Sequence, residues 1–99
     1  MEVVILSGAD SDMDEIYSHV EESEGGERFL LAVDRELELI RNYPRLVPAS
    51  LLGKVRRVRI KRTQYGLFYT IQGNRLMIIA IQDLRQNPVT LGKIIQERL

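Results

Sequence analysis

The sequence contains no cysteine, and this absence excludes disulfide bonds and metal sites built on thiolates. A chain without cysteine also suits the reducing environment of the cytoplasm, where we expect this protein to act. No run of about 18 apolar residues is present, so we expect no membrane-spanning helix and no membrane partner. The first ten residues, MEVVILSGAD, lack the basic segment and the long apolar core of a secretion signal, and we expect none.

Residue patterns of common catalytic and cofactor sites are also missing. The sequence has no glycine-rich phosphate loop, no cluster of His, Asp and Glu with metal-ligand spacing, and no spacing typical of a serine triad. We therefore expect no cofactor and no bound metal. The single histidine, His19, falls in a segment rich in acidic residues, where a solvated helix residue is a simpler interpretation than a catalytic base.

Charge of both signs is abundant but unevenly distributed. The 99 residues predict one domain, 1–99, and a content of 44% hydrophobic and 28% charged residues is typical of a folded chain. Residues 1–50 carry a net charge of −8 and residues 51–99 a net charge of +8. This split indicates either an anionic or acidic partner for the basic half, or neutralisation of one half by the other within the fold.

Apolar periodicity predicts an α+β fold with one strand, a hairpin of two helices, three further strands and a C-terminal helix. The two helices are expected to cover one face of a small, mostly antiparallel sheet. A segment that is apolar on both faces, LMIIAI, predicts a central strand. The expected elements are a strand at 2–6, a helix that follows SGADSD and ends at SEGG (23–26), a helix at 27–42, strands at 54–62, 65–72 and 75–82, and a helix from Pro88.

Each helix of the predicted hairpin has one apolar stripe. The first stripe consists of Ala9, Met13, Ile16 and Val20. The second consists of Phe29, Val33, Leu37 and Ile40, with Leu30 widening it. The opposite, acidic face of the first helix consists of Asp12, Asp14, Glu15, Glu21 and Glu22.

The strand that follows the hairpin reads KVRRVRIKR and holds six basic residues and no acidic one. Because side chains alternate between the faces of a sheet, Val58 and Ile60 are predicted to face the helices. Arg57, Arg59 and Lys61 then lie together on the opposite face. Three neighbouring cations repel one another, and a polyanion or an acidic peptide would relieve this repulsion. We predict a binding surface here; the alternative is a solvated face without a partner.

The aromatic residues of the next strand have two interpretations. They could stack on nucleic-acid bases beside the basic strand, or they could belong to the core. Alternation places Phe68 on the face opposite to Tyr65 and Tyr69, so we expect at least half of them in the core.

The order and spacing of these segments resemble the RelE/ParE toxins of bacterial type II toxin–antitoxin systems. The resemblance is carried by the helical hairpin, then VRRVRIKRTQYGLFYTI, a turn, LMIIAI and DLRQNP, and it extends from Val3 to about Ile95. It implies a small toxin that a cognate antitoxin neutralises, within a toxin–antitoxin hetero-oligomer. ParE-type members of the family poison DNA gyrase, whereas RelE-type members cut messenger RNA on the ribosome.

RNA cleavage by attack of a 2′-hydroxyl requires groups that transfer protons as well as cations that stabilise the phosphate. The resemblance places the basic-strand cations of the RelE-type site on Arg57 and Arg59. It places the remaining RelE-type arginines and the C-terminal tyrosine on Gly66, on Gln86 or Arg85, and near Gly92. The cations are thus present and the proton-transfer groups are not. The resemblance therefore implies a ParE-like toxin that acts by binding gyrase. The alternatives are a RelE-like ribonuclease and a family member without toxicity.

The residues predicted to bind the antitoxin or the target are Arg57, Arg59, Lys61, Arg62 and Arg85. In the segment that resembles the family's ending, Asp83 and Arg85 leave the last strand. They are expected to form a local ion pair or a cap for the final helix, or to take part in an interface. Three apolar residues of the C-terminal segment are predicted to bind either the sheet or the antitoxin: Leu91, Ile94 and Ile95.

Overall fold

A computed structural model describes residues 1–21 and 25–99 of the chain and has the expected order of elements. These are β1 (Glu2–Ile5), α1 (Ser7–Glu21), α2 (Gly26–Asn42), β2 (Arg56–Arg59), β3 (Tyr65–Gln72), β4 (Arg75–Asp83) and α3 (Pro88–Arg98). None of the helices in the described ranges is long and apolar enough to cross a membrane. The predicted break at SEGG (23–26) includes Ser23 and Glu24, which lie outside the described residues, as does Glu22 of the predicted acidic face. Gly25 directly precedes α2.

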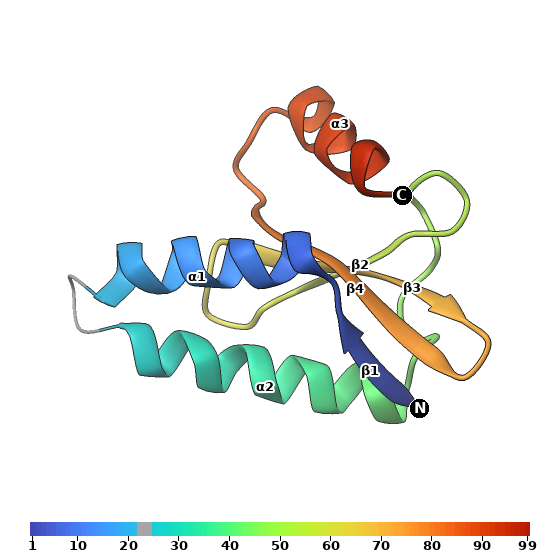
Figure 1. The fold of residues 1–99 in the computed structure, drawn as a ribbon, viewed down its shortest axis with the longest axis horizontal. Helices are drawn as coiled ribbons and strands as arrows, with labels where there is room; N and C mark the ends of the chain where they lie inside the picture. The colour runs from blue at the N-terminus through green and yellow to red at the C-terminus, as the bar shows by residue number, and fades with distance from the viewer. Residues whose placement is uncertain (22–24) are drawn as a thin grey trace.

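The strands form one sheet in the order β1-β4-β3-β2 (Figure 1). β1 is parallel to β4, and the other two pairings are antiparallel, which confirms a mostly antiparallel sheet. The segment LMIIAI lies in β4, which has a neighbour on each side, so its central position is also confirmed. β1 and β2 are left as the two edges of the sheet.

Helices cover both faces of the sheet, and each face has its own core. α1 and α2 run side by side over one face, where both predicted stripes pack against Leu67, Tyr69 and Ile78. α3 lies over the opposite face, where Leu91 and Ile95 pack with Phe68 and other buried residues (Figure 1). The predicted widening of the α2 stripe by Leu30 is wrong, because that side chain is 38% exposed.

The basic strand is shorter than predicted. Regular pairing spans Arg56–Arg59 rather than 54–62. The chain turns back at residues 61–64, where Arg62 takes a left-handed backbone conformation (φ 65°) and Ile60 N–H donates to the Tyr65 carbonyl at 2.9 Å. Side chains after Ile60 therefore no longer alternate between the faces of the sheet. The prediction that Lys61 shares a strand face with Arg57 and Arg59 is wrong.

Asp12 was expected on the solvent face of the first helix, and that expectation is also wrong. Its carboxylate is buried and accepts hydrogen bonds from Arg98 Nη1 and Nη2, at 2.6 and 3.0 Å. The same carboxylate accepts a hydrogen bond from Ile81 N–H at 2.9 Å, and Arg98 also donates to the Ile79 carbonyl at 3.2 Å. The pair thus joins α1, β4 and α3.

A bulge in β4 explains why these backbone groups are available. Phe68 pairs with Ala80 while Tyr69 pairs with Ile78, so Ile79 is an extra residue in β4. Pairing with β1 ends at Ile78, whose carbonyl accepts from Leu6 N–H. Backbone groups of alternate residues point away from β3, and one extra residue shifts this alternation by one position. After the bulge, Ile79 and Ile81 therefore direct backbone groups away from β3. Asp12 and Arg98 then satisfy groups of β4 that β1 is too short to reach.

We expect Asp12→Ala to lower the free energy of unfolding by about 2–4 kcal/mol, since it leaves a partly buried guanidinium without its carboxylate partner and Ile81 N–H without an acceptor. The side chains of Asp12 and Arg98 are 7% and 27% exposed. The matched control is Glu2→Ala, which breaks the Glu2–Arg75 pair, whose side chains are 60% and 62% exposed. This change should cost no more than about 1 kcal/mol. Urea denaturation measures both, and equal losses would contradict the assignment.

Candidate functional site

Two of the predicted cations share one face of the edge strand β2. Arg57 lies opposite Phe68, which is buried in the core under α3, whereas Val58 packs against the core under α1 and α2. Arg59 lies on the same face as Arg57, and both are exposed. Neither guanidinium forms an ion pair with a carboxylate within the described parts of the chain, and Arg59 Nε donates to the Thr63 carbonyl at 3.1 Å. The predicted cationic face is therefore present for these two residues.

A third cation of the strand, Arg56, has a structural role instead. Its half-buried guanidinium donates to the Val47 carbonyl and so ties the loop before β2 to the strand. Nearby, the Tyr69 hydroxyl donates to the Pro44 carbonyl at 2.7 Å, and burial raises the pKa of Tyr69. All three aromatic residues considered for base stacking are buried, which confirms the core interpretation: Tyr65, Phe68 and Tyr69.

Lys61 and Arg62 lie in the turn that follows β2, outside the strand that carries Arg57 and Arg59. They line a groove of about 710 Å³ between that turn and α2. Arg28 and Arg35 of α2 line the same groove, together with apolar side chains such as Phe29 and Leu31; Glu36 is the one acidic residue among the described lining residues.

Sequence reasoning missed the two arginines of α2, because the interpretation of that helix rested on its apolar stripe and not on the charges of its other faces. Arg28 and Arg35 are separated by seven residues, a spacing that places both on one face of a helix. This spacing is a local signal that could have been found. The tertiary structure adds the turn at Lys61 and Arg62, so four cationic side chains line the groove together with apolar ones.

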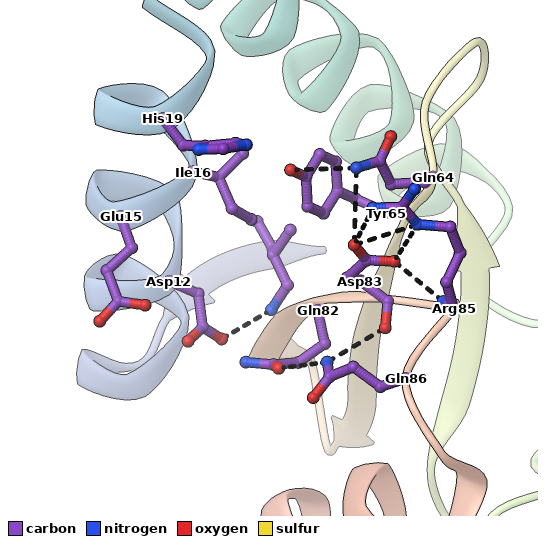
Figure 2. A pocket seen from close by; sticks show the side chains of 11 residues that line it. Asp12, Glu15, Ile16, His19, Gln64, Tyr65, Gln82, Asp83, Arg85 and Gln86 are labelled. Carbon is purple, nitrogen blue, oxygen red and sulfur yellow. Dashed lines mark hydrogen bonds and ion pairs between the residues drawn. The ribbon is translucent and has the colours of Figure 1, made fainter.

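A polar cavity of about 280 Å³ lies on the side of the sheet that faces α1 (Figure 2). His19 and Glu15 approach it from the helix, and Asp83 and Arg85 approach it from the end of β4. His19 is exposed, in agreement with the interpretation of a solvated helix residue. Within the described ranges, no group of three or more His, Asp and Glu side chains is arranged to hold a metal ion.

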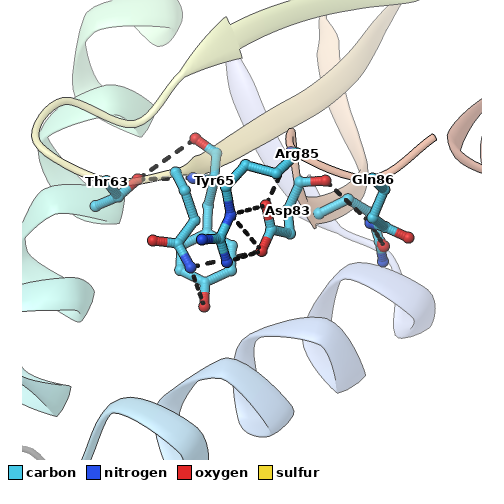
Figure 3. A network of polar contacts seen from close by, with 7 residues as sticks. Thr63, Tyr65, Asp83, Arg85 and Gln86 are labelled. Atoms are coloured by element: carbon cyan, nitrogen blue, oxygen red, sulfur yellow. Dashed lines mark hydrogen bonds and ion pairs between the residues drawn. The ribbon is translucent and has the colours of Figure 1, made fainter. Parts of the chain in front are cut away.

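Arg85 is paired with Asp83 at the rim of this cavity. Its Nη2 lies 2.8 Å and its Nε 3.1 Å from the Asp83 carboxylate, and its backbone N–H donates to the same carboxylate at 2.9 Å (Figure 3). Gln86 donates to the Asp83 carbonyl, and Asn87, rather than Asp83, caps α3. The structure thus keeps Arg85 on the α1 side of the sheet, away from the face that carries Arg57 and Arg59. Its predicted binding role stays a prediction.

The two glycines at RelE-type positions differ in their surroundings. A Cβ added to Gly66 would lie 2.5 Å from Leu84 Cδ2, so packing under this strand leaves no room for a side chain. A Cβ added to Gly92, in α3, would meet no atom within 4 Å. Next to Gly92, Leu91 and Ile95 are buried against the sheet, and Ile94 is half-buried. The segment was predicted to bind either the sheet or the antitoxin, and in the structure Leu91 and Ile95 pack against the sheet.

Comparison with known proteins agrees with this architecture. The sequence model of the family described as "ParE toxin of type II toxin-antitoxin system, parDE" matches residues 3–88. No curated protein matches the chain in sequence. Among solved structures, a chain of the "Chromosomal ParDE TA system from P. aeruginosa" is similar with a TM-score of 0.64 and 23% sequence identity. The match covers 84% of this chain and 95% of that chain, and it confirms the α+β fold.

Asp83 should titrate far below its ordinary range. The hydrogen bonds from Arg85 lower the pKa of this carboxyl from 3.8 to about 2. Because the folded-state pKa is below the unfolded value, the stabilisation is present above pH 3.8 and is lost as the pH falls through about 2. Carbon-13 NMR of the carboxyl groups measures this pKa. Arg85→Gln should return it towards 3.8, whereas Arg75→Gln should leave it unchanged; a wild-type value near 3.8 would contradict the pairing.

Alanine should have opposite effects at the two glycines. Gly66→Ala should lower the free energy of unfolding by about 1–3 kcal/mol, since Leu84 must move. Gly92→Ala should raise it by about 0.5–1 kcal/mol, because alanine favours a helix and the position is open. Thermal and urea denaturation measure both changes. Combining Gly66→Ala with Leu84→Ala should cost less than the sum of the two single changes, and strict additivity would count against the contact.

Proposed function

This chain belongs to the family of ParE toxins of type II toxin–antitoxin systems, and from that membership we propose that it inhibits growth by binding DNA gyrase until a cognate antitoxin neutralises it. The gyrase target follows from the resemblance to ParE-type members. The choice of binding over RNA cleavage is supported by the residues of this chain. Because the two proposed partners are gyrase and the antitoxin, we propose that the chain acts in the cytoplasm.

The observation that carries the proposal is a cationic surface for which the described residues supply no histidine. Arg57 and Arg59 are exposed on the α3 face of the sheet. Arginine has a pKa too high to act as an ordinary general base at neutral pH. His19 lies on α1 at the opposite face, so the sheet separates the imidazole from both arginines. Such a surface can hold an anionic or acidic partner, and the imidazole that could activate a 2′-hydroxyl lies elsewhere in the described chain.

The RelE-type positions add to this argument. Leu84 fills the space where a side chain at residue 66 would have to lie. The guanidinium of Arg85 is held by the Asp83 carboxylate, and a paired cation is less available to a phosphate. Gly92 is open but has no side chain. These features favour a protein that acts by binding.

Two surfaces of this chain are complementary to a segment with acidic and apolar side chains, and they support an antitoxin partner. One is the exposed face of β2 with Arg57 and Arg59. The other is the groove beside α2, which is lined by four cationic side chains and several apolar ones. A segment with acidic and apolar side chains could cover both, and covering them would block binding to another partner.

We expect expression of this chain alone to arrest bacterial growth, with a DNA-damage response and gyrase-linked DNA breaks that precede any fall in protein synthesis. Co-expression with the protein encoded beside it should restore growth. The measurements are colony counts, recovery of gyrase–DNA adducts and pulse labelling of new protein. A prior stop in translation with transcripts cut at the ribosomal A site would replace the proposal with the ribonuclease function. Unimpaired growth would show that toxicity is absent.

A further inference from the structure

We propose that the groove between α2 and the turn after β2 binds a guanine nucleotide. The base donates hydrogen bonds to the Glu36 carboxylate, and the phosphates lie among the four cationic side chains that line the groove: Arg28, Arg35, Lys61 and Arg62. The inference goes beyond the proposed function, because it requires neither gyrase nor an antitoxin. It is carried by three observations: a buried carboxylate without a partner, an excess of positive charge, and a turn whose conformation is fixed.

Glu36 is buried in the wall of the groove without a partner. The residue is 3% exposed, yet it forms no hydrogen bond and no ion pair with the described residues. Across residues 1–21 and 25–99, no side-chain nitrogen or oxygen is both fully enclosed and unsatisfied, so the Glu36 oxygens keep an opening to the groove. A buried charge is costly unless it is paired. The carboxylate is therefore available to accept hydrogen bonds from a bound molecule.

The charge of the groove restricts what that molecule can be. Among the described residues, four cationic side chains and one carboxylate line it, which leaves an excess of three positive charges. None of the four cations forms an ion pair with a carboxylate of the described chain. The ligand must be anionic overall and still present N–H donors to Glu36. A nucleotide combines both properties, whereas the cations would repel an amine or a metal ion.

The pattern of donors and acceptors at Glu36 selects the base. An ionised carboxylate only accepts hydrogen bonds, and its two oxygens can accept from two neighbouring N–H groups. Guanine alone among the common bases presents such a pair, N1–H and the 2-amino group. Adenine and cytosine have an acceptor nitrogen beside their amino group, and a carboxylate repels that nitrogen. Glu36 therefore favours guanine.

The dimensions of the groove also suit a nucleotide. Its volume of about 710 Å³ lies within the range of roughly 300–1,000 Å³ that is typical of ligand sites. Glu36 and Arg28 are eight positions apart on α2, or about 12 Å along the helix axis. This length is comparable with the distance from the base to the terminal phosphate of a nucleoside diphosphate. Between these two residues, Phe29 and Ala32 supply apolar surface, and the Phe29 ring makes an edge-on contact with Tyr65 at 5.6 Å.

The turn that carries Lys61 and Arg62 has a fixed conformation. Thr63 Oγ1 donates to the Ile60 carbonyl at 2.7 Å and accepts from the Tyr65 N–H at 3.0 Å (Figure 3). The Thr63 N–H also donates to the Ile60 carbonyl, at 3.1 Å. Because the turn is already formed, little conformational entropy is lost when its two cations bind a phosphate.

Calorimetric titration of the purified chain with GDP tests the proposal. GDP should bind at least about tenfold more tightly than ADP, which carries the same phosphates. It should also bind at least about tenfold more tightly than inorganic pyrophosphate, which contacts the cations alone. Absence of GDP binding, or an equal affinity for GDP and either control, would overturn the inference. Neither result bears on the proposed function, because gyrase and the antitoxin take no part in the titration.

A substitution at Glu36 should change the preferred base. Glutamine has nearly the shape of glutamate, but its amide both donates and accepts, as the amino group and N1 of adenine require. Glu36→Gln should weaken GDP binding by at least about tenfold and strengthen ADP binding. The variant should keep the fold, because the change removes a buried charge that has no partner in the described chain. A folded variant with the wild-type preference for GDP over ADP would overturn the role of Glu36.

Paired substitutions on α2 test the phosphate contacts. Arg28→Ala with Arg35→Ala should weaken GDP binding by at least about tenfold, and both positions are exposed, so the fold should be kept. The matched control is Arg41→Ala with Arg75→Ala, which removes the same charge from exposed positions outside the groove. The control should weaken binding by less than about threefold. Equal losses would show an effect of net charge alone and would overturn the site, and this comparison still decides if Glu36→Gln is unfolded.

Discussion

The ion pair between Asp12 and Arg98 is the constraint on which the arrangement of the helices depends. Asp12 belongs to α1, over one face of the sheet, and Arg98 ends α3, over the other. Their side chains meet at the edge of β4, beyond the end of β1, and satisfy two backbone groups that the bulge at Ile79 turns outwards. One short contact thus closes an exposed strand edge and fixes the C-terminal helix on the sheet.

Covering this part of β4 leaves β1 and β2 as the two edges of the sheet. On one side, β1 and then the Asp12–Arg98 pair cover the backbone of β4. On the other side, the outward groups of Arg57 and Arg59 in β2 keep no backbone partner within the described residues. Positive charge on the β2 edge discourages pairing between identical molecules.

The cations of the C-terminal half serve separate purposes, and this separation bears on the chemistry. Arg56 holds a loop, Arg85 is held by Asp83, and Arg98 is part of the ion pair with Asp12. Arg57 and Arg59 remain as an exposed pair on one face, and Lys61 and Arg62 join α2 in a groove. Catalysis on a phosphate would need such groups to converge on one point together with a proton-transfer group. Their dispersion suits binding over an extended surface.

The sequence by itself determined the order of elements, the two helical stripes, the central position of β4 and the alternation that separates Val58 from Arg57 and Arg59. Each of these follows from periodicity and turn residues within a few positions. Only the tertiary structure decided the burial of Asp12, the bulge at Ile79, and the groove that Lys61 and Arg62 share with α2. Asp12 and Arg98 are 86 positions apart, and no local pattern encodes which distant charge a buried carboxylate meets. That choice is made when the sheet edge and two helices pack together, because only then is water excluded from their polar groups.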